Sequence, residues 1–125
     1  MILDTCALSA LLAGDEALVE LVSSVEKQTL PAVVLGEYRF GMARSRIRRD
    51  LDPVLDELES ESTILRVDEN TAKHYADVKE GLRCIGKPIP ENDLWIAALA
   101  RQHNMPVVTR DDHFRHVTDL RTVGW

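Results

Sequence analysis

Long apolar runs are missing from this sequence of 125 residues. A helix needs about 18 consecutive apolar residues to cross a bilayer, and no stretch here meets that requirement. The first residues also lack the basic region and extended apolar segment of a signal peptide. We therefore expect a cytoplasmic protein with no membrane segment. There is no internal repeat and no low-complexity tract, so a single domain over residues 1–125 is the simplest organisation.

Cysteine is scarce as well, and its placement excludes two classes of small domain. The two cysteines, Cys6 and Cys84, stand far apart, without CxxC spacing and without a histidine at zinc-finger distance. Neither a zinc finger nor a disulfide framework is therefore indicated. We expect both residues to be buried free thiols.

Positive charge is in deficit, with 15 Lys and Arg against 21 Asp and Glu and a net charge of −6. This balance argues against binding of nucleic acid through a general positive field. The distribution is uneven, however, because the segment from residue 39 to 49 contains five arginines and no acid. We call these residues the arginine strip: Arg39, Arg44, Arg46, Arg48 and Arg49. The strip is a candidate contact for a phosphate backbone, and an ordinary solvated surface is the alternative.

Short apolar runs alternate along the chain with segments of helical periodicity. We expect strands at residues 1–3, 29–31, 63–67, 105–109 and 120–123. The first strand should lead into a leucine-rich helix that ends at Gly14, and further helices should cover 15–27, 32–43, 47–61, 70–86 and 91–103. This alternation predicts an α/β fold, a three-layer sandwich in which helices flank a central, mainly parallel sheet.

Two details of the helices follow from local patterns. Asn70 is the expected N-cap of the helix that runs toward Gly86. In the helix over 47–61, the residues expected to face inward are Val54, Leu55 and Leu58.

Two acids should lie at the carboxyl edge of the sheet, where ligands bind in open parallel sheets. Asp4 ends the first strand, and Asp111 lies two residues beyond the strand that ends at Thr109. The adjacent Asp112 is an alternative to Asp111. A single aspartate at a strand end is usually a turn or cap residue, so only the combination of several acids is informative.

Two further acids interrupt apolar helical faces. Asp93 precedes Ile96, Ala97 and Ala100 at the spacing of one core-facing stripe. An ionised group on such a face is costly unless it is paired. Glu37 has the same problem, because the residues on its predicted face are Val33, Val34, Phe40 and Gly41.

The four acids together predict a metal site. Four anions gathered at one sheet edge would repel and desolvate one another, and a hard cation removes that penalty. Oxygen ligands without His or Cys at metal spacing suit Mg²⁺ or Mn²⁺ rather than zinc, as one ion or two. The pair His113 and His116 forms an HxxH that we interpret as surface residues rather than metal ligands.

With these residues assembled, the chain resembles the PIN domain, and within it the VapC-type toxins of prokaryotic toxin-antitoxin pairs. The resemblance runs nearly end to end and rests on four segments in order: Ile2-Leu3-Asp4-Thr5, Gly36-Glu37 with Gly41, Asn92-Asp93 with Ile96-Ala97-Ala98 and Ala100, and Val108-Thr109-Arg110-Asp111 with Phe114.

The resemblance implies a Mg²⁺- or Mn²⁺-dependent endoribonuclease that hydrolyses RNA and is controlled by a small cognate antitoxin. Asp4, Glu37 and Asp93 would be metal ligands, and Asp111 would complete the cluster. The resemblance favours Asp111 over Asp112, because Asp111 follows Thr109-Arg110 at the family's spacing. Thr5 and Thr109 would be neighbouring hydroxyls that orient carboxylates or water. The resemblance also favours a homodimer, and Trp95 could pack either in the core or across that interface.

Two other readings differ in class. A catalytically inactive PIN-like module that only binds a partner would be expected to have lost one of the four acids, and none is missing. A phosphoryl-transfer domain with an acidic Mg²⁺ site is less well supported. A receiver domain has a lysine after its last strand and a haloacid-dehalogenase-like phosphatase has Asp-x-Asp, whereas this chain has no lysine in 117–125 and reads Asp4-Thr5-Cys6.

Overall fold

The computed structural model describes residues 1–125 as five short strands, six α-helices and one 3₁₀ helix. In chain order the elements are β1 (Ile2–Leu3), α1 (Thr5–Leu12), α2 (Glu16–Ser23), β2 (Thr29–Pro31), α3 (Ala32–Met42), α4 (Arg48–Glu61), β3 (Thr63–Leu65), α5 (Glu69–Cys84), α6 (Glu91–Gln102), β4 (Val107–Val108), η1 (Asp112–His116) and β5 (Thr122–Val123).

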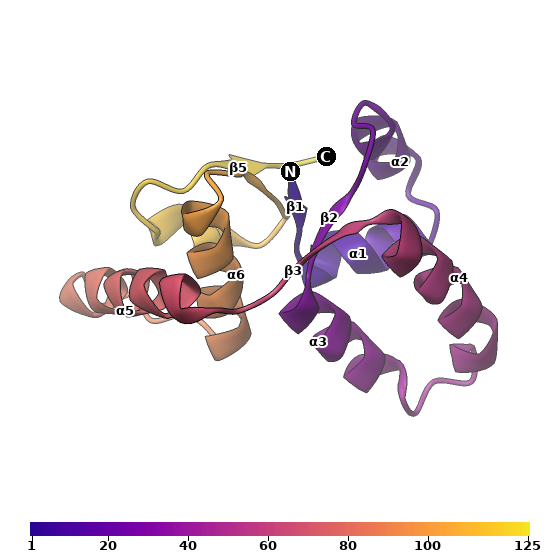
Figure 1. Ribbon diagram of the computed structural model, residues 1–125, viewed down its shortest axis with the longest axis horizontal. Coiled ribbons are helices and arrows are strands. Elements are labelled where there is room, and N and C mark those ends of the chain that lie inside the picture. The colour runs from indigo at the N-terminus through magenta and orange to yellow at the C-terminus, as the bar shows by residue number, and fades with distance from the viewer.

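All strands pair in parallel, in the order β3-β2-β1-β4-β5. The helix pair α5 and α6 lies on one side of the strands, and α1, α2 and α4 lie on the other (Figure 1). The predicted three-layer α/β fold is therefore confirmed. The chain leaves β1 toward β2 on one side and returns to β4 on the other, so the carboxyl ends of β1 and β4 form the switch point at which ligands bind in such sheets.

The central strands are buried on both faces, as a parallel sheet between two helical layers requires. Ile2, Leu30 and Val107 are fully buried. On α6 the predicted core-facing stripe is also confirmed, since Ile96 and Ala97 are fully buried. The stripe places Asp93, one turn earlier, at the point where the core meets the carboxyl edge of the sheet.

Several element ends differ from the sequence-based expectation. The last strand begins at Thr122 rather than at residue 120, and the third ends at Leu65 rather than at 67. Asp68, not Asn70, is the N-cap of α5, because its carboxylate accepts the backbone N–H groups of both Asn70 and Thr71. The hydroxyl of Thr71 accepts the backbone N–H of Asp68 in return, and this reciprocal capping box moves the start of the helix upstream.

Two apolar residues that we expected inside are exposed. Phe40 is 84% exposed and Val54 is 46% exposed. The buried face of α3 is centred on Val34 and Tyr38, and Phe40 lies roughly 200° around the helix from Tyr38 at about 100° per residue. Glu37 lies between them, about 60° from Val34 on one side and about 60° from Phe40 on the other, and is partly buried. In α4 the inward position is Leu55, and its neighbour Val54 points about 100° away.

The expectation that the cysteines are buried was wrong. Cys6 and Cys84 are both exposed free thiols. Each lies in a terminal turn of its helix, Cys6 at the start of α1 and Cys84 at the end of α5. None of the helices has both the length and the apolar character needed to cross a membrane.

Candidate metal centre

Asp4 stands between β1 and α1 and is only 3% exposed. Its Oδ1 accepts the backbone N–H of Ala7 at 2.7 Å and so caps α1, and its Oδ2 accepts the hydroxyl of Thr109. Burial raises the pKa of Asp4 above its ordinary value, and these two hydrogen bonds oppose the rise. The fold therefore holds a carboxylate, at some cost, at the switch point of the sheet.

Thr109 follows β4 and links two acids. Besides donating to Asp4, its Oγ1 accepts the backbone N–H of Asp111 at 2.8 Å. Asp111 in turn caps η1, because its Oδ1 accepts the backbone N–H of His113 at 2.9 Å. The neighbouring Asp112 points away and pairs with Arg115 at 2.9 Å. Of the two adjacent aspartates, only Asp111 lies at the carboxyl edge beside Asp4.

Asp93 lies in the first turn of α6, partly buried. Burial is the main cause that raises its pKa, a hydrogen bond from His113 lowers it, and the nearby Asp111 adds repulsion. Nδ1 of His113 lies 3.0 Å from Oδ2 of Asp93 and 3.1 Å from Oδ1 of Asp111. His113 thus joins the acids, contrary to our interpretation of the HxxH pair, whereas His116 lies outside the group.

Glu37 comes from the second turn of α3 and is partly buried. The hydroxyl of Thr5 donates to its Oε2 at 2.6 Å, which fixes the direction of the carboxylate across the gap between α1 and α3. Thr5 and Thr109 therefore each donate a hydroxyl hydrogen bond to one of the acids.

A pocket of about 290 Å³ unites these side chains at the carboxyl edge of the sheet. Its lining residues are Asp4, Thr5, Cys6, Glu37, Pro90, Asn92, Asp93, Asp111 and His113. All four predicted acids thus face one cavity. Within it Asp93, Asp111 and His113 form a tighter group, with one ligand atom from each lying within 4.8 Å of the other two.

His113 was missed as a member of the site because the histidine pair was judged as a unit. The informative signal was its spacing from Asp111. Asp111 caps the helical turn by accepting the backbone N–H of His113, two residues later. The side chain of His113 can therefore reach the same carboxylate.

The residues present fit a divalent cation. Four carboxylates from four separate segments share the pocket, and burial raises the pKa of both Asp4 and Asp93. No Lys or Arg lines the pocket to balance this charge. Carboxylate oxygens are the ligands that Mg²⁺ and Mn²⁺ prefer, so the donor set favours these ions.

The arginine strip is not uniform. Arg39 ties α3 to α4 through carboxylate oxygens of Asp56 and Glu59, each at 2.8 Å, and Arg48 pairs with Asp52 at 3.2 Å. These pairs neutralise two of the five charges. The arginines without an ion pair are Arg44, Arg46 and Arg49, all exposed in the 43–49 region between and at the start of the two helices.

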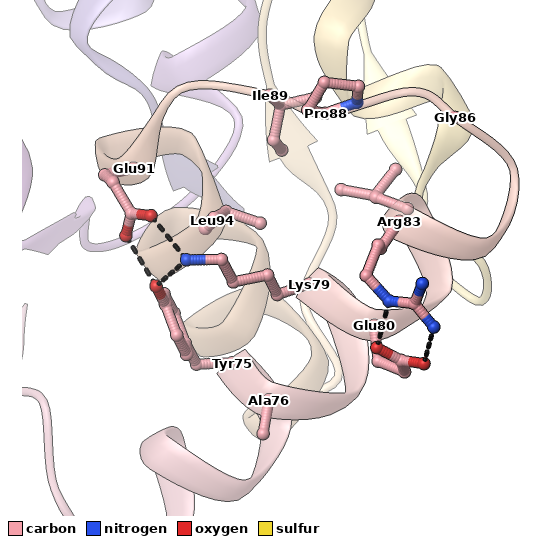
Figure 2. A pocket seen from close by; sticks show the side chains of 11 residues that line it. Tyr75, Ala76, Lys79, Glu80, Arg83, Gly86, Pro88, Ile89, Glu91 and Leu94 are labelled. Carbon is pink, nitrogen blue, oxygen red and sulfur yellow. Dashed lines mark hydrogen bonds and ion pairs between the residues drawn. The ribbon is translucent and has the colours of Figure 1, made fainter.

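A larger pocket, about 630 Å³, lies away from the acids, between α5 and the segment that leads into α6 (Figure 2). Lys79 and Tyr75 both bind Glu91 across it, and Arg83 and Glu80 pair at its far end (Figure 2). Trp95 stacks on Tyr75 with ring centroids 4.1 Å apart, so it packs between α5 and α6 at the surface rather than in the core. The lining is mainly apolar and carries no cluster of acids, which makes the smaller acidic pocket the candidate for chemistry.

This combination of a parallel five-stranded sheet and an acidic pocket at its switch point defines a family. The model of the PIN domain matches residues 1–120, and the chain belongs to the PIN domain family.

Among curated proteins, the chain is similar to ribonuclease VapC5 of Mycobacterium tuberculosis. The two are 34% identical over 119 residues, which covers 90% of this chain and 84% of that protein. It is also similar to ribonuclease VapC2 of Haemophilus influenzae, with 31% identity over 100 residues, 79% of this chain and 76% of that protein.

A solved structure with a similar fold is FitAcB from Neisseria gonorrhoeae. It matches with a TM-score of 0.85 and 30% identity, covering 97% of this chain and 94% of that one. VapBC-5 of Mycobacterium tuberculosis, a member of the VapBC family of toxin-antitoxin systems, matches with a TM-score of 0.78 and 30% identity, covering 99% of this chain and 97% of that one.

Proposed function

We propose that this protein is a metal-dependent endoribonuclease and the toxin of a toxin-antitoxin pair. The observation that carries the proposal is the convergence of Asp4, Glu37, Asp93 and Asp111 on one pocket. These acids come from four separate segments of the chain. Burial makes the ionised forms of Asp4 and Asp93 costly without a cation, and the charge of Asp111 repels that of Asp93. Two curated relatives of matching length are ribonucleases, which supports RNA as the substrate class.

In this proposal Asp4, Glu37 and Asp93 bind one or two ions of Mg²⁺ or Mn²⁺, and Asp111 completes the cluster. When bound, such a metal lowers the pKa of water and stabilises negative charge on phosphate oxygens. Thr109 holds Asp4 in place, and Thr5 holds Glu37. Glu37 or Asp111 holds the attacking water and accepts its proton, since each has a carboxylate oxygen that no hydrogen bond within the protein occupies.

The RNA backbone needs a positive surface near this acidic pocket. We propose that Arg44, Arg46 and Arg49 provide it, because their charges are not neutralised by ion pairs. Arg39 and Arg48 belong to the same predicted strip, but Arg39 holds α3 against α4 through Asp56 and Glu59, and Arg48 pairs with Asp52 within α4. A ribonuclease of cellular RNA acts in the cytoplasm, and we propose that location.

Two protein partners belong to the proposal. The first is a small antitoxin that covers the acidic pocket and inserts a basic side chain among the carboxylates, where opposite charge favours it. The structural relatives FitAcB and VapBC-5 support such a partner, since the second is a member of a toxin-antitoxin family. The second partner is another copy of the chain, and the proposed homodimer is tested by sedimentation equilibrium of the purified protein.

A cleavage assay on RNA tests the proposed activity. The purified protein, freed of any partner, is incubated with total RNA after dialysis against EDTA, and Mg²⁺ or Mn²⁺ is then added back. We expect no cleavage in EDTA, cleavage after either ion is restored, and no cleavage of single-stranded DNA under the same conditions. A protein that binds a divalent ion yet leaves every RNA intact would instead be an inactive PIN-like module that only binds a partner.

A further inference from the structure

We propose that His113 is a nitrogen ligand of the metal centre, and that it makes the site favour a first-row transition ion over Mg²⁺. This inference rests on the proposed function, since it concerns the ion that the acidic pocket binds. It goes further in assigning a residue to the centre and a preference to the site. An all-carboxylate centre would take Mg²⁺ readily, whereas one imidazole among the ligands changes the order of affinities.

The geometry around Nδ1 of His113 points to a shared cation. This atom lies 3.0 Å from a carboxylate oxygen of Asp93 and 3.1 Å from one of Asp111. Three lone pairs cannot face one another at these distances unless a proton or a metal ion lies among them. Two ligand atoms each about 2.1 Å from one ion, and at right angles to each other, are about 3 Å apart. Nδ1 and each of the two oxygens therefore have the spacing of neighbouring positions around an octahedral ion.

The backbone holds His113 in this place. Asp111 caps η1, and the backbone N–H of His113 donates to the same Oδ1 of Asp111 that faces the imidazole. The next residue, Phe114, is 1% exposed and anchors the helical turn in the core. The edge of the ring remains open to the pocket, since the side chain of His113 is 47% exposed. An incoming ion thus meets a histidine that is already directed at two of its ligands.

The chemistry of the donor set determines the preference. Mg²⁺ binds oxygen almost exclusively and gains little from an imidazole, whereas affinity for nitrogen rises along the series from Mn²⁺ to Cu²⁺. The addition of Nδ1 to the carboxylate ligands should therefore leave Mg²⁺ affinity nearly unchanged and raise that for Mn²⁺ and its neighbours. If a proton rather than a metal occupies the position, His113 only positions the two carboxylates and affects both ions alike.

Mn²⁺ is a suitable probe because it is paramagnetic, and no RNA is needed to observe its binding. Pulsed electron paramagnetic resonance of the Mn²⁺ complex detects a directly bound imidazole through coupling to ¹⁴N. Titration followed by the signal of free Mn²⁺ gives its Kd, and competition gives the Kd of Mg²⁺. The variants are His113→Asn, whose amide can still donate a hydrogen bond to the carboxylates, and His116→Asn, the same change three residues further along and outside the acidic pocket.

We expect ¹⁴N coupling in the wild type and in His116→Asn, and its loss in His113→Asn. The ratio of Mg²⁺ to Mn²⁺ dissociation constants should fall by roughly 10-fold or more in His113→Asn only, because loss of a ligand should cost at least as much as loss of a residue that supports one. Absence of ¹⁴N coupling in the wild type, or an equal loss of both affinities in His113→Asn, would overturn the assignment while leaving the proposed nuclease intact. A wild type that binds neither ion would overturn both.

Discussion

The hydroxyl of Thr109 donates a hydrogen bond to the carboxylate of Asp4 and accepts one from the backbone N–H of Asp111. One side chain thus joins the ends of β1 and β4, the two neighbouring strands at the switch point, and fixes the acids that follow them. Thr109 and Asp4 are both at most 5% exposed, so neither group can exchange this partner for water.

The variant Thr109→Val tests this link, because valine has nearly the same shape and lacks the hydroxyl. It removes the hydroxyl donor to Oδ2 of Asp4 and leaves the N–H of Asp111 without its acceptor, so we expect a loss of about 1–3 kcal/mol in the free energy of unfolding. Metal affinity and RNA cleavage should each fall about 10- to 100-fold. Chemical denaturation and metal titration measure these effects. Thr109→Ser keeps the hydroxyl and should retain wild-type metal affinity and RNA cleavage. A fully active Thr109→Val would show that the hydrogen bond is dispensable.

The stability of the metal-free protein should depend on pH through Asp4 and Asp93. Burial raises the pKa of both groups above the unfolded value, so each destabilises the fold when ionised, and this cost is relieved as pH falls through the raised native pKa. Asp93→Asn should therefore melt above the wild type in EDTA at neutral pH, by about 3–5 °C if the relief is about 1 kcal/mol. The difference should shrink toward acidic pH.

Metal should reverse that order, since an ion that binds only the folded state stabilises it. Saturating Mn²⁺ should raise the melting temperature of the wild type more than that of Asp93→Asn. Equal shifts would mean that Asp93 contributes little to metal binding. If Asp93→Asn is instead the less stable protein in EDTA, then His113 and the start of α6 already compensate the charge of Asp93.

The arginine strip gives a prediction with an internal control. Replacing Arg44, Arg46 and Arg49 by glutamine should weaken binding of single-stranded RNA and lower the slope of log affinity against log salt by up to about 2, at about 0.7 per lost phosphate contact. The experiment uses the inactive Asp93→Asn background and fluorescence anisotropy. Arg39→Gln should alter the melting temperature rather than the salt slope, because Arg39 is held by Asp56 and Glu59. An unchanged slope in the triple variant would assign the strip to a solvated surface.

The ion pairs of these arginines could not be predicted from the sequence, although the fold could. Alternation of apolar runs and helical stripes was enough to predict the sheet and the layers, and the ends of strands were enough to place Asp4 and Asp111. The partners of Arg39 could not be seen, because they belong to α4, and only tertiary packing brings them to α3. In hindsight Asp52, Asp56 and Glu59 recur at the spacing of one helical face, which predicts an acidic stripe that needs a basic partner.

In the acidic pocket too, the sequence indicated residues through patterns within one helix or strand, but not contacts between separate elements. Asp93 was recognised because it heads a buried stripe on its own helix. Phe40 was wrongly expected on the inward face, since an 11-residue helix with only three buried side chains leaves the direction of its apolar face ambiguous. The approach of His113 to Asp93 joins η1 to α6 across 20 residues of sequence, and no periodicity reports it.

The antitoxin proposal predicts that a co-expressed partner silences the nuclease by occupying the acidic pocket. Addition of the purified partner should abolish RNA cleavage and block Mn²⁺ binding in parallel, because a basic side chain and the ion compete for the same carboxylates. Mn²⁺ resonance and a cleavage assay on the same samples measure both effects. A complex that cleaves RNA at the rate of the free protein would exclude this mode of control.

The most direct test compares RNA cleavage by Asp111→Asn and Asp112→Asn, adjacent residues of identical chemistry that differ in direction. Asp111 lines the acidic pocket beside the other three acids, whereas Asp112 is exposed and pairs with Arg115. With Mn²⁺ present, and with melting curves that show both variants folded, the rate of Asp111→Asn should fall at least about 100-fold, as should those of Asp4→Asn, Glu37→Gln and Asp93→Asn. Asp112→Asn should cleave at the wild-type rate. Wild-type cleavage by a folded Asp111→Asn or Asp93→Asn protein would contradict the assignment of this pocket as the catalytic centre.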